Sequence, residues 1–198
     1  MVELEARLRK AVAELPDGLA AHIHRVEVEA VRLAALHGVD EGRARLAALG
    51  HDLVRHEKGP RLLDLAAEYG LMPDEIECAS PILVHGPVAA AMLLQDYGVE
   101  DADLVLGVDC HTTGRAGMSA LENVLFVADK VEPHKLTRDA ALSEVKDFAE
   151  NDLDAGVLRY LDFYLDEAVR RGWEIHPRSL EAREDLIARF RREGIGGA

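Results

Sequence analysis

Apolar side chains recur at helical spacing along the whole chain, and this pattern most constrains the fold. They fall at positions i, i+3, i+4 and i+7, and no window shows the sustained period-two alternation of β-branched residues that is typical of strands. Aromatic residues make up only 5% of the sequence. A length of 198 residues suits one ordinary domain. We therefore expect an all-α fold.

Glycines and capping residues divide this pattern into separate helices. Gly38 suits a left-handed C-cap, Asp40 an N-cap, and Ser119 with Glu122 forms a capping box. The main expected helices cover about residues 2–15, 19–37, 40–53, 60–69, 88–97, 101–110, 119–131, 138–150, 153–171 and a last one from 179. No linker or repeat interrupts them. The sequence predicts a single helical-bundle domain over 1–198, with a core of about 19–135 and C-terminal helices at 136–192 packed on it.

The charge balance excludes several classes of partner. There are 23 Lys and Arg against 37 Asp and Glu, a net charge of −14, which argues against a nucleic-acid grip and against binding to anionic membranes. No stretch approaches the roughly 20 apolar residues of a membrane span. Residues 1–10 form a charged amphipathic run rather than a signal peptide. Two cysteines cannot form a disulfide framework, so we expect a cytoplasmic protein.

The dipeptide His51-Asp52 is the first candidate for chemistry. It follows an apolar helical run at 44–50 that we expect to be buried. An ionised aspartate in such a place costs several kcal/mol unless a cation or hydrogen-bond donors compensate. For a lone His-Asp pair, a solvated aspartate beside a packed histidine is the commoner arrangement. The positions of the other histidines therefore decide whether this pair is a candidate metal site or an ordinary helix end.

Four further residues stand at helix ends or on apolar helix faces. His85 lies where a helix begins, His111 ends a helix, and His22 and Asp129 lie on apolar faces. Singly, each is more often a hydrogen-bonded core group. Together with His51-Asp52 they make four imidazoles and two carboxylates, a set that suits iron, manganese or zinc. Six ligands are too many for one metal with an open position, so a binuclear site is expected.

Several segments carry a family resemblance. They are Ala-Ala-Leu-Gly-His-Asp at 47–52, His-Gly-Pro-Val at 85–88, His-Thr-Thr-Gly-Arg at 111–115 with Met-Ser at 118–119, Val-Ala-Asp-Lys-Val-Glu-Pro at 127–133, Ile-His-Pro at 175–177 and Glu-Ala-Arg at 181–183. Together with His22, they resemble the HD superfamily of metal-dependent phosphohydrolases. The closer resemblance is to its YqeK-like branch, the symmetrical bis(5′-nucleosyl)-tetraphosphatases. It covers about residues 19–186.

The resemblance implies an HD-domain hydrolase that splits diadenosine tetraphosphate into two ADP through a metal-bound hydroxide. It implies that Asp52 bridges two metal ions, and that His51 and Asp52 are central to catalysis. The metals would be iron, with manganese, magnesium or zinc as alternatives. The implied ligands are His22, His51 and Asp129 on one ion and His85 and His111 on the other, with Asp52 shared. The spacing to Gly38 favours His22 over His24 as the first ligand.

The residues expected to hold the polyphosphate are Arg55, Thr112, Thr113, Arg115 and Lys135. Arg55 stands where the family often has lysine, and Lys135 where it often has arginine. These exchanges keep the charge but change the geometry of phosphate contact. The residues before His22 also depart from the family, with Leu-Ala-Ala at 19–21 in place of basic or aromatic side chains.

Two alternatives to this function stay open. One is another HD-type phosphohydrolase, acting on a nucleotide monophosphate or a guanosine alarmone. The other is a metal- or nucleotide-binding module without turnover, against which the intact His51-Asp52 and Asp129 argue. The expected partner is a nucleotide polyphosphate, with neither nucleic acid nor membrane involved. A homodimer is left open.

Overall fold

The computed structural model describes residues 2–192 and residue 194, and within these residues the regular structure is entirely helical. The all-α prediction is confirmed. The helices are α1 (Val2–Ala13), α2 (Asp17–His37), α3 (Glu41–Gly50), α4 (Gly59–Glu68), α5 (Glu75–Ala79), the 3-10 helix η1 (Pro81–Val84), α6 (His85–Gln95), α7 (Ala102–Cys110), α8 (Ala120–Val131), α9 (Pro133–Arg138), α10 (Leu142–Asn151), α11 (Leu153–Arg171) and α12 (Pro177–Arg192).

The helix ends that carry capping signals lie close to where the sequence predicts them. Gly38 ends α2 with φ of 67°, in the left-handed region that favours glycine. The Asp40 carboxylate accepts a hydrogen bond from the Arg43 amide at the start of α3. Ser119 and Glu122 bond each other's backbone amides in a full capping box that opens α8. Local side-chain chemistry therefore sets these boundaries.

Other boundaries differ from the prediction. The helix expected at 138–150 begins only at Leu142, and a separate helix, α9, precedes it. Pro133 stands in the first turn of α9 and the Glu132 side chain caps it through the His134 amide, a start signal that the helical periodicity did not reveal. In addition, α3 ends at Gly50 rather than near residue 53, and α6 begins at His85 rather than at residue 88.

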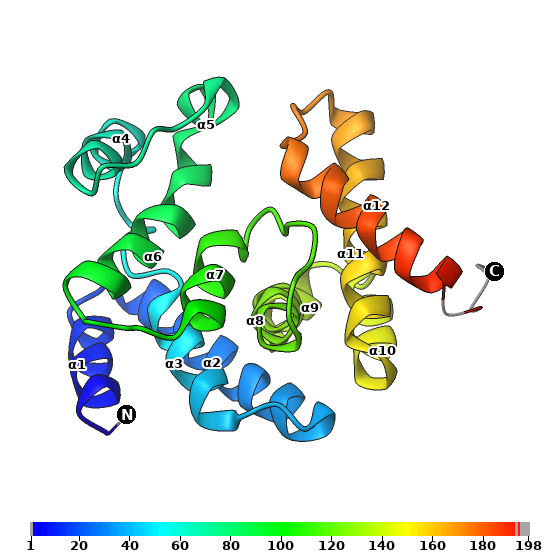
Figure 1. The fold of residues 1–198 in the computed structure, drawn as a ribbon, viewed down its shortest axis with the longest axis horizontal. Coiled ribbons are helices and arrows are strands. Elements are labelled where there is room, and N and C mark those ends of the chain that lie inside the picture. The colour runs from blue at the N-terminus through cyan, green and yellow to red at the C-terminus, as the bar shows by residue number, and fades with distance from the viewer. Residues whose placement is uncertain (1, 193, 195–198) are drawn as a thin grey trace.

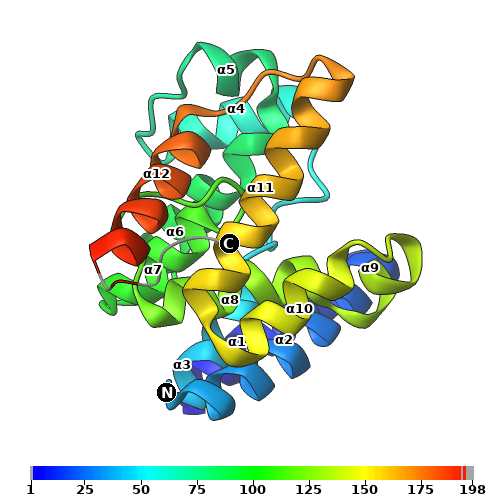
Figure 2. The ribbon, with the colours of Figure 1, turned by 90° about the vertical axis from the view of Figure 1, so that its right-hand side faces the viewer.

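Helix α8 forms the centre of the molecule. Figure 1 looks along it, with α7 on one side and α11 on the other, and α2 also packs against it. Every residue of α8 from Leu121 to Val131 is buried, and Phe126 is the largest fully buried side chain. Figure 2 shows α11 crossing in front of α8 with α12 at its side. A helix buried all round is the expected core of such a bundle.

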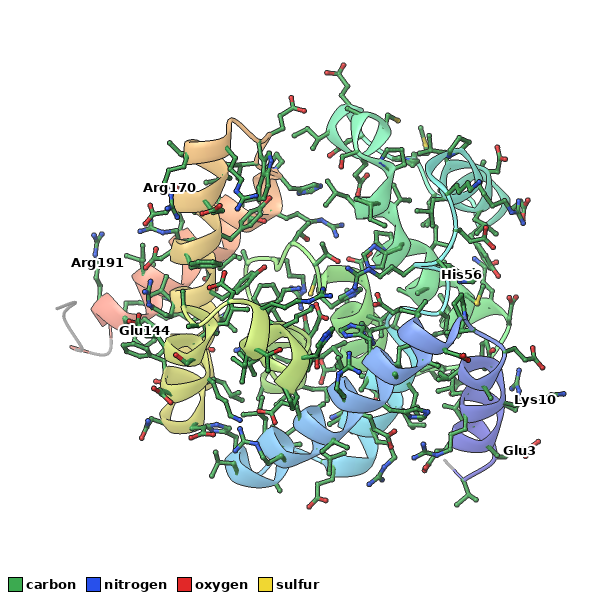
Figure 3. All side chains as sticks on the ribbon, turned by 180° about the vertical axis from the view of Figure 1, so that it is seen from behind. Glu3, Lys10, His56, Glu144, Arg170 and Arg191 are labelled. Carbon is green, nitrogen blue, oxygen red and sulfur yellow. The ribbon has the colours of Figure 1, made fainter. Side chains whose placement is uncertain are left out.

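Charged side chains cover the periphery. Figure 3 shows Lys10, Glu144 and Arg191 pointing outward from the helices that carry them. None of the helices in the described residues is both long enough and apolar enough to cross a membrane. The acidic surplus of the sequence is therefore carried largely by solvated faces, while Asp52, Asp129, Lys130 and Glu132 are buried, as are Glu29 and Glu122 elsewhere.

The crossing of α10 and α11 depends on a glycine, and this gives a test of the fold. A Cβ at Gly156 would clash with the Ala149 Cβ and lie 2.7 Å from its Cα. We expect Gly156→Ala to lower the free energy of unfolding by about 1–3 kcal/mol, the usual cost of overpacking, in urea denaturation followed by circular dichroism. Gly18→Ala is the control, because a Cβ there meets nothing within 4 Å and alanine favours the helix. Equal stability of the two variants would contradict this packing.

Candidate metal centre

Six buried side chains from separate helices converge at one end of α8. They are His22 in the first half of α2, His51 and Asp52 just after α3, His85 at the start of α6, His111 just after α7, and Asp129 near the end of α8. Each is at most 8% exposed. The structure thus brings together all six residues that the sequence singled out as ligands.

Three of these histidines have the same local arrangement. The Nδ1 atoms of His51 and His111 lie 2.6 Å and 2.7 Å from the carbonyl oxygens of Ala48 and Val108, and His85 bonds the Ile82 carbonyl in the same way. Each carbonyl belongs to the last turn of a helix, where carbonyls lack their full set of intrahelical partners, and that of Ile82 also accepts from the His85 amide. A carbonyl only accepts, so Nδ1 carries the proton and Nε2 of the neutral ring keeps its lone pair.

The Nδ1 atom of His22 faces a carboxylate instead of a backbone carbonyl. Its Nδ1 lies 3.4 Å from Oε1 of Glu132, and Glu132 is held by Arg25 and by the His134 amide. Burial lowers the pKa of His51 to about 3 and also lowers the pKa of His111. The His51 and His111 rings are therefore neutral near pH 7, as a metal-ligating imidazole must be.

The two oxygens of Asp52 face two different pairs of histidines. Oδ1 lies 3.1 Å from Nε2 of His85 and 3.5 Å from Nε2 of His111. Oδ2 lies 3.5 Å and 3.4 Å from the Nε2 atoms of His22 and His51. Asp129 stands at the second pair, with Oδ1 3.1 Å from Nε2 of His22. One carboxylate is therefore shared between two groups of imidazoles.

The donor atoms are suited to hold metal ions. The four rings form a row, with centroids 5.6 Å apart for His22 and His51, 5.0 Å for His51 and His111, and 4.9 Å for His111 and His85. Two sets have ligand atoms all within 4.8 Å of one another: His22, His51 and Asp129, and His51, Asp52 and His111. In the described structure, the Nε2 atoms of His22 and His51 and Oδ1 of Asp52 are buried without a hydrogen-bond partner. Such orphaned atoms are what a metal would satisfy.

A glycine permits the close approach of α6 and α7 at this centre. A Cβ at Gly86 would lie 2.9 Å from the Asp109 carbonyl oxygen and 3.0 Å from that of Val108. With no side chain there, the start of α6 meets the end of α7, and the Nε2 atoms of His85 and His111 come within 3.1 Å. The Gly after His85 thus has a packing reason.

Three cations surround the two aspartates. Lys130 and Lys135 lie 2.6 Å and 2.7 Å from the oxygens of Asp129, and Arg55 lies 2.9 Å from Oδ2 of Asp52. Burial by itself raises the pKa of Asp129, but both lysines outweigh it and hold that pKa well below its usual value. The pKa of Asp52 is likewise held low, because the neighbouring histidines outweigh the effect of its burial. Both carboxylates are therefore ionised.

A cavity of about 490 Å³ opens onto this cluster. Four of the five residues expected to hold phosphate line it, namely Arg55, Thr112, Thr113 and Lys135. The Thr112 hydroxyl lies 3.3 Å from Nε2 of His111. The fifth, Arg115, is not among the lining residues, because its Nε and Nη2 lie 2.7 Å and 2.6 Å from the Glu122 carboxylate.

Sequence reasoning gave no role to several residues of the site. Lys130 is 7% exposed, and its ammonium also bonds the His111 carbonyl at 3.0 Å. Its position directly after Asp129 was the sequence feature that could have identified it as part of the site. The far wall of the cavity includes Tyr160 and Tyr164 of α11 and Trp173 beyond it. The spacing of four between the tyrosines places them on one helix face, but no periodicity shows which face meets the metal cluster.

Comparisons with known proteins agree with this site. No family model matches the chain. A symmetrical bis(5′-nucleosyl)-tetraphosphatase of Staphylococcus aureus is 31% identical over 76% of this chain and 76% of its own length. The protein of the same name from Bacillus subtilis is 33% identical over 76% of this chain and 81% of its own.

A solved structure shares the whole fold. It is a crystal structure from Clostridium acetobutylicum, described as a predicted HD superfamily hydrolase involved in NAD metabolism. It superposes with a TM-score of 0.87 at 27% identity and covers 93% of this chain and 97% of its own. Together with the two relatives at 31% and 33% identity, it shows that the chain has the HD hydrolase fold and belongs to the family of symmetrical bis(5′-nucleosyl)-tetraphosphatases.

Proposed function

We propose that this protein hydrolyses diadenosine tetraphosphate symmetrically to two ADP at a binuclear metal centre. The observation that carries the proposal is Asp52, a buried carboxylate whose two oxygens face separate pairs of histidines. This arrangement is what a carboxylate bridging two metal ions requires. Family membership supports the substrate, because relatives at 31% and 33% identity carry the name of that activity.

Six residues would hold the two ions. His22, His51 and Asp129 would serve one ion and His85 with His111 the other, with Asp52 shared. The mixture of imidazole and carboxylate suits iron, which we propose first, and also manganese or zinc, whereas magnesium prefers oxygen ligands alone. The hydrogen bonds from each Nδ1 fix the rings, so that every Nε2 points into the site.

When bound, the two metals would lower the pKa of a water molecule and take up negative charge on the phosphate oxygens. The side chains of the protein arrange the rest. Arg55 and Lys135 line the cavity and stand against Asp52 and Asp129. We propose that they turn to the polyphosphate when metals take over the two carboxylates. The Thr112 hydroxyl lies 3.5 Å from Nε2 of His85 and 3.3 Å from Nε2 of His111, and we propose that it contacts the same phosphates.

The proposal extends to the cellular setting of the protein. Cys78 and Cys110 are both free thiols, which fits the reducing cytoplasm. The substrate is a short polyanion. It needs only local positive charge, so an acidic protein can bind it without binding extended nucleic acid.

Product analysis tests the proposed reaction. Metal-loaded protein incubated with diadenosine tetraphosphate should give ADP alone, resolved by anion-exchange chromatography. ATP with AMP would show cleavage at a different phosphate and reject the symmetrical reaction. Release of phosphate only from a nucleotide monophosphate or a guanosine alarmone would favour another HD-type hydrolase. Absence of turnover on all these substrates would favour a binding module.

Metal content tests the shared ligand. We expect Asp52→Ala to lose both metals and Asp52→Asn to lose most of the metal, because each oxygen of Asp52 faces one of the two proposed metal positions. His22→Ala should lose about one of two ions. The measurement is metal per protein chain by mass spectrometry after dialysis.

The control for this metal measurement is His24→Ala. His24 is two residues from His22 on the same helix, its side chain is 53% exposed, and it pairs with Glu27 instead of the cluster. It should keep the full metal content. Thermal unfolding of each variant shows whether the fold is intact. A folded Asp52→Ala variant that keeps two metals would refute the binuclear arrangement.

Two arginines near the site should differ in their effects. Arg55 faces the cavity, so Arg55→Ala should raise KM for diadenosine tetraphosphate about tenfold, the loss of one charge-assisted phosphate contact. Arg115 pairs with the fully buried Glu122, so Arg115→Ala should lower the melting temperature and leave KM nearly unchanged. Steady-state kinetics and thermal unfolding separate the two. The opposite pattern would make Arg115 the phosphate ligand.

A further inference from the structure

Two exposed apolar side chains line the cavity above the metal centre. Ile82 on η1 is 45% exposed, and Trp173, just after α11, is 48% exposed. They come from segments far apart in sequence: Ile82 follows α5, and Trp173 lies in the connection between α11 and α12, two regions that face each other in the upper part of Figure 1. Single exposed apolar residues are common on protein surfaces. Two that share one cavity next to a chemical centre indicate a ligand with an apolar face.

The side of the cavity formed by α11 is aromatic, and its geometry is fixed. Tyr160 and Tyr164 lie one helical turn apart, with ring planes 8° apart and centroids 6.4 Å apart. Gly172 ends α11 with φ of 67°, and the Trp173 amide donates to the Ala168 carbonyl at 2.9 Å. The helix end therefore fixes the backbone position from which the indole projects. We call Tyr160, Tyr164 and Trp173 the aromatic wall.

This aromatic wall begins at the metal centre. The Tyr160 ring lies against Lys130, whose Nζ is 5.5 Å from the ring centroid, and Lys130 pairs with Asp129 at 2.6 Å. Tyr164 follows one turn further along α11, and Trp173 stands beyond the end of the helix. A ligand whose phosphates occupy the centre would therefore have the aromatic wall beside the group attached to those phosphates.

The indole of Trp173 is held from one side. The Arg171 guanidinium lies over its ring, with Cζ 4.9 Å from the centroid. Arg171 is not among the residues that line the cavity, whereas Trp173 is. A flat ring has two faces, so the guanidinium covers one of them and leaves the other for a ligand. This cation–π contact favours one orientation of the indole.

We propose that Tyr164 and Trp173, with Ile82 across the cavity, bind the nucleobase of one half of the substrate by stacking. This inference rests on the proposed function, since it takes the phosphates to lie at the metal centre. Aromatic side chains contact the π face that every base has, so stacking tolerates different bases. We therefore expect adenine and guanine nucleotides to bind with similar affinity.

The chain carries its own probe for this site. Trp173 is the single tryptophan, so fluorescence excited selectively at tryptophan reports on the aromatic wall alone. ADP and GDP added to metal-loaded protein should quench the emission with similar Kd. Inorganic pyrophosphate should bind, as measured by calorimetry, without comparable quenching. Quenching by pyrophosphate equal to that by ADP would overturn the proposal.

Variants give the second measurement. Trp173→Ala should weaken ADP binding by about 5- to 20-fold, the loss typical of one stacking partner, and leave pyrophosphate binding unchanged. Tyr164→Ala and Ile82→Ala should act in the same direction, and Trp173→Phe should restore most of the affinity. Phe148→Ala is the matched control, because Phe148 is 50% exposed on α10 and does not line this cavity. It should leave ADP binding unchanged.

The outcomes distinguish this inference from the proposed function. Unchanged ADP affinity in Trp173→Ala, or an equal loss for ADP and pyrophosphate, would refute stacking even if diadenosine tetraphosphate is hydrolysed. A gain in affinity of ADP and GDP over pyrophosphate that is lost in Trp173→Ala would support stacking even in a protein that fails to cleave diadenosine tetraphosphate. The binding measurements do not depend on turnover.

Discussion

A fully buried carboxylate, Asp52, is the constraint on which the rest of this structure depends. Placing an ionised aspartate where no solvent reaches it costs several kcal/mol unless charge and hydrogen bonds compensate. Here the compensation comes from histidines at helix ends and from Arg55. Helices α2, α3, α6 and α7 all bring a residue to this point, and α8 supplies Asp129. The bundle is thus arranged around one charge.

The local charge of this site is opposite to that of the molecule as a whole. The chain carries a net charge of −14, yet three cations, Arg55, Lys130 and Lys135, face two carboxylates at the cavity. Two bound metals would add further positive charge. A short polyphosphate that reaches the cavity meets this field, while a long polyanion also meets the acidic surface. The charge balance argues against extended nucleic acid as a partner, and the proposed short substrate agrees with that expectation.

Residues near one another in sequence were the more predictable part of this structure. The caps at Gly38, Asp40 and Ser119 and the histidines at helix ends follow from spacing and side-chain chemistry within a few residues. The ion-pair and hydrogen-bond partners of the cations near the site could not be predicted in this way. Arg115 pairs with Glu122 one helix further on, and Lys130 bonds the carbonyl of His111. Periodicity fixes the face of a helix but not which other helix it meets.

The metal cluster and the aromatic wall, at the two ends of the cavity, come from different parts of the chain. The C-terminal helices therefore contribute to the proposed nucleobase site as well as to packing. The candidate metal ligands all lie between residues 22 and 129, in helices that the core holds rigidly. The aromatic wall follows them, on α11 and its end. Lys130, between Asp129 and Tyr160, contacts both. Substitutions at Trp173 are therefore expected to alter the affinity for the nucleoside more than the phosphate chemistry, because Trp173 stands beyond the end of α11 and is not one of the six candidate ligands.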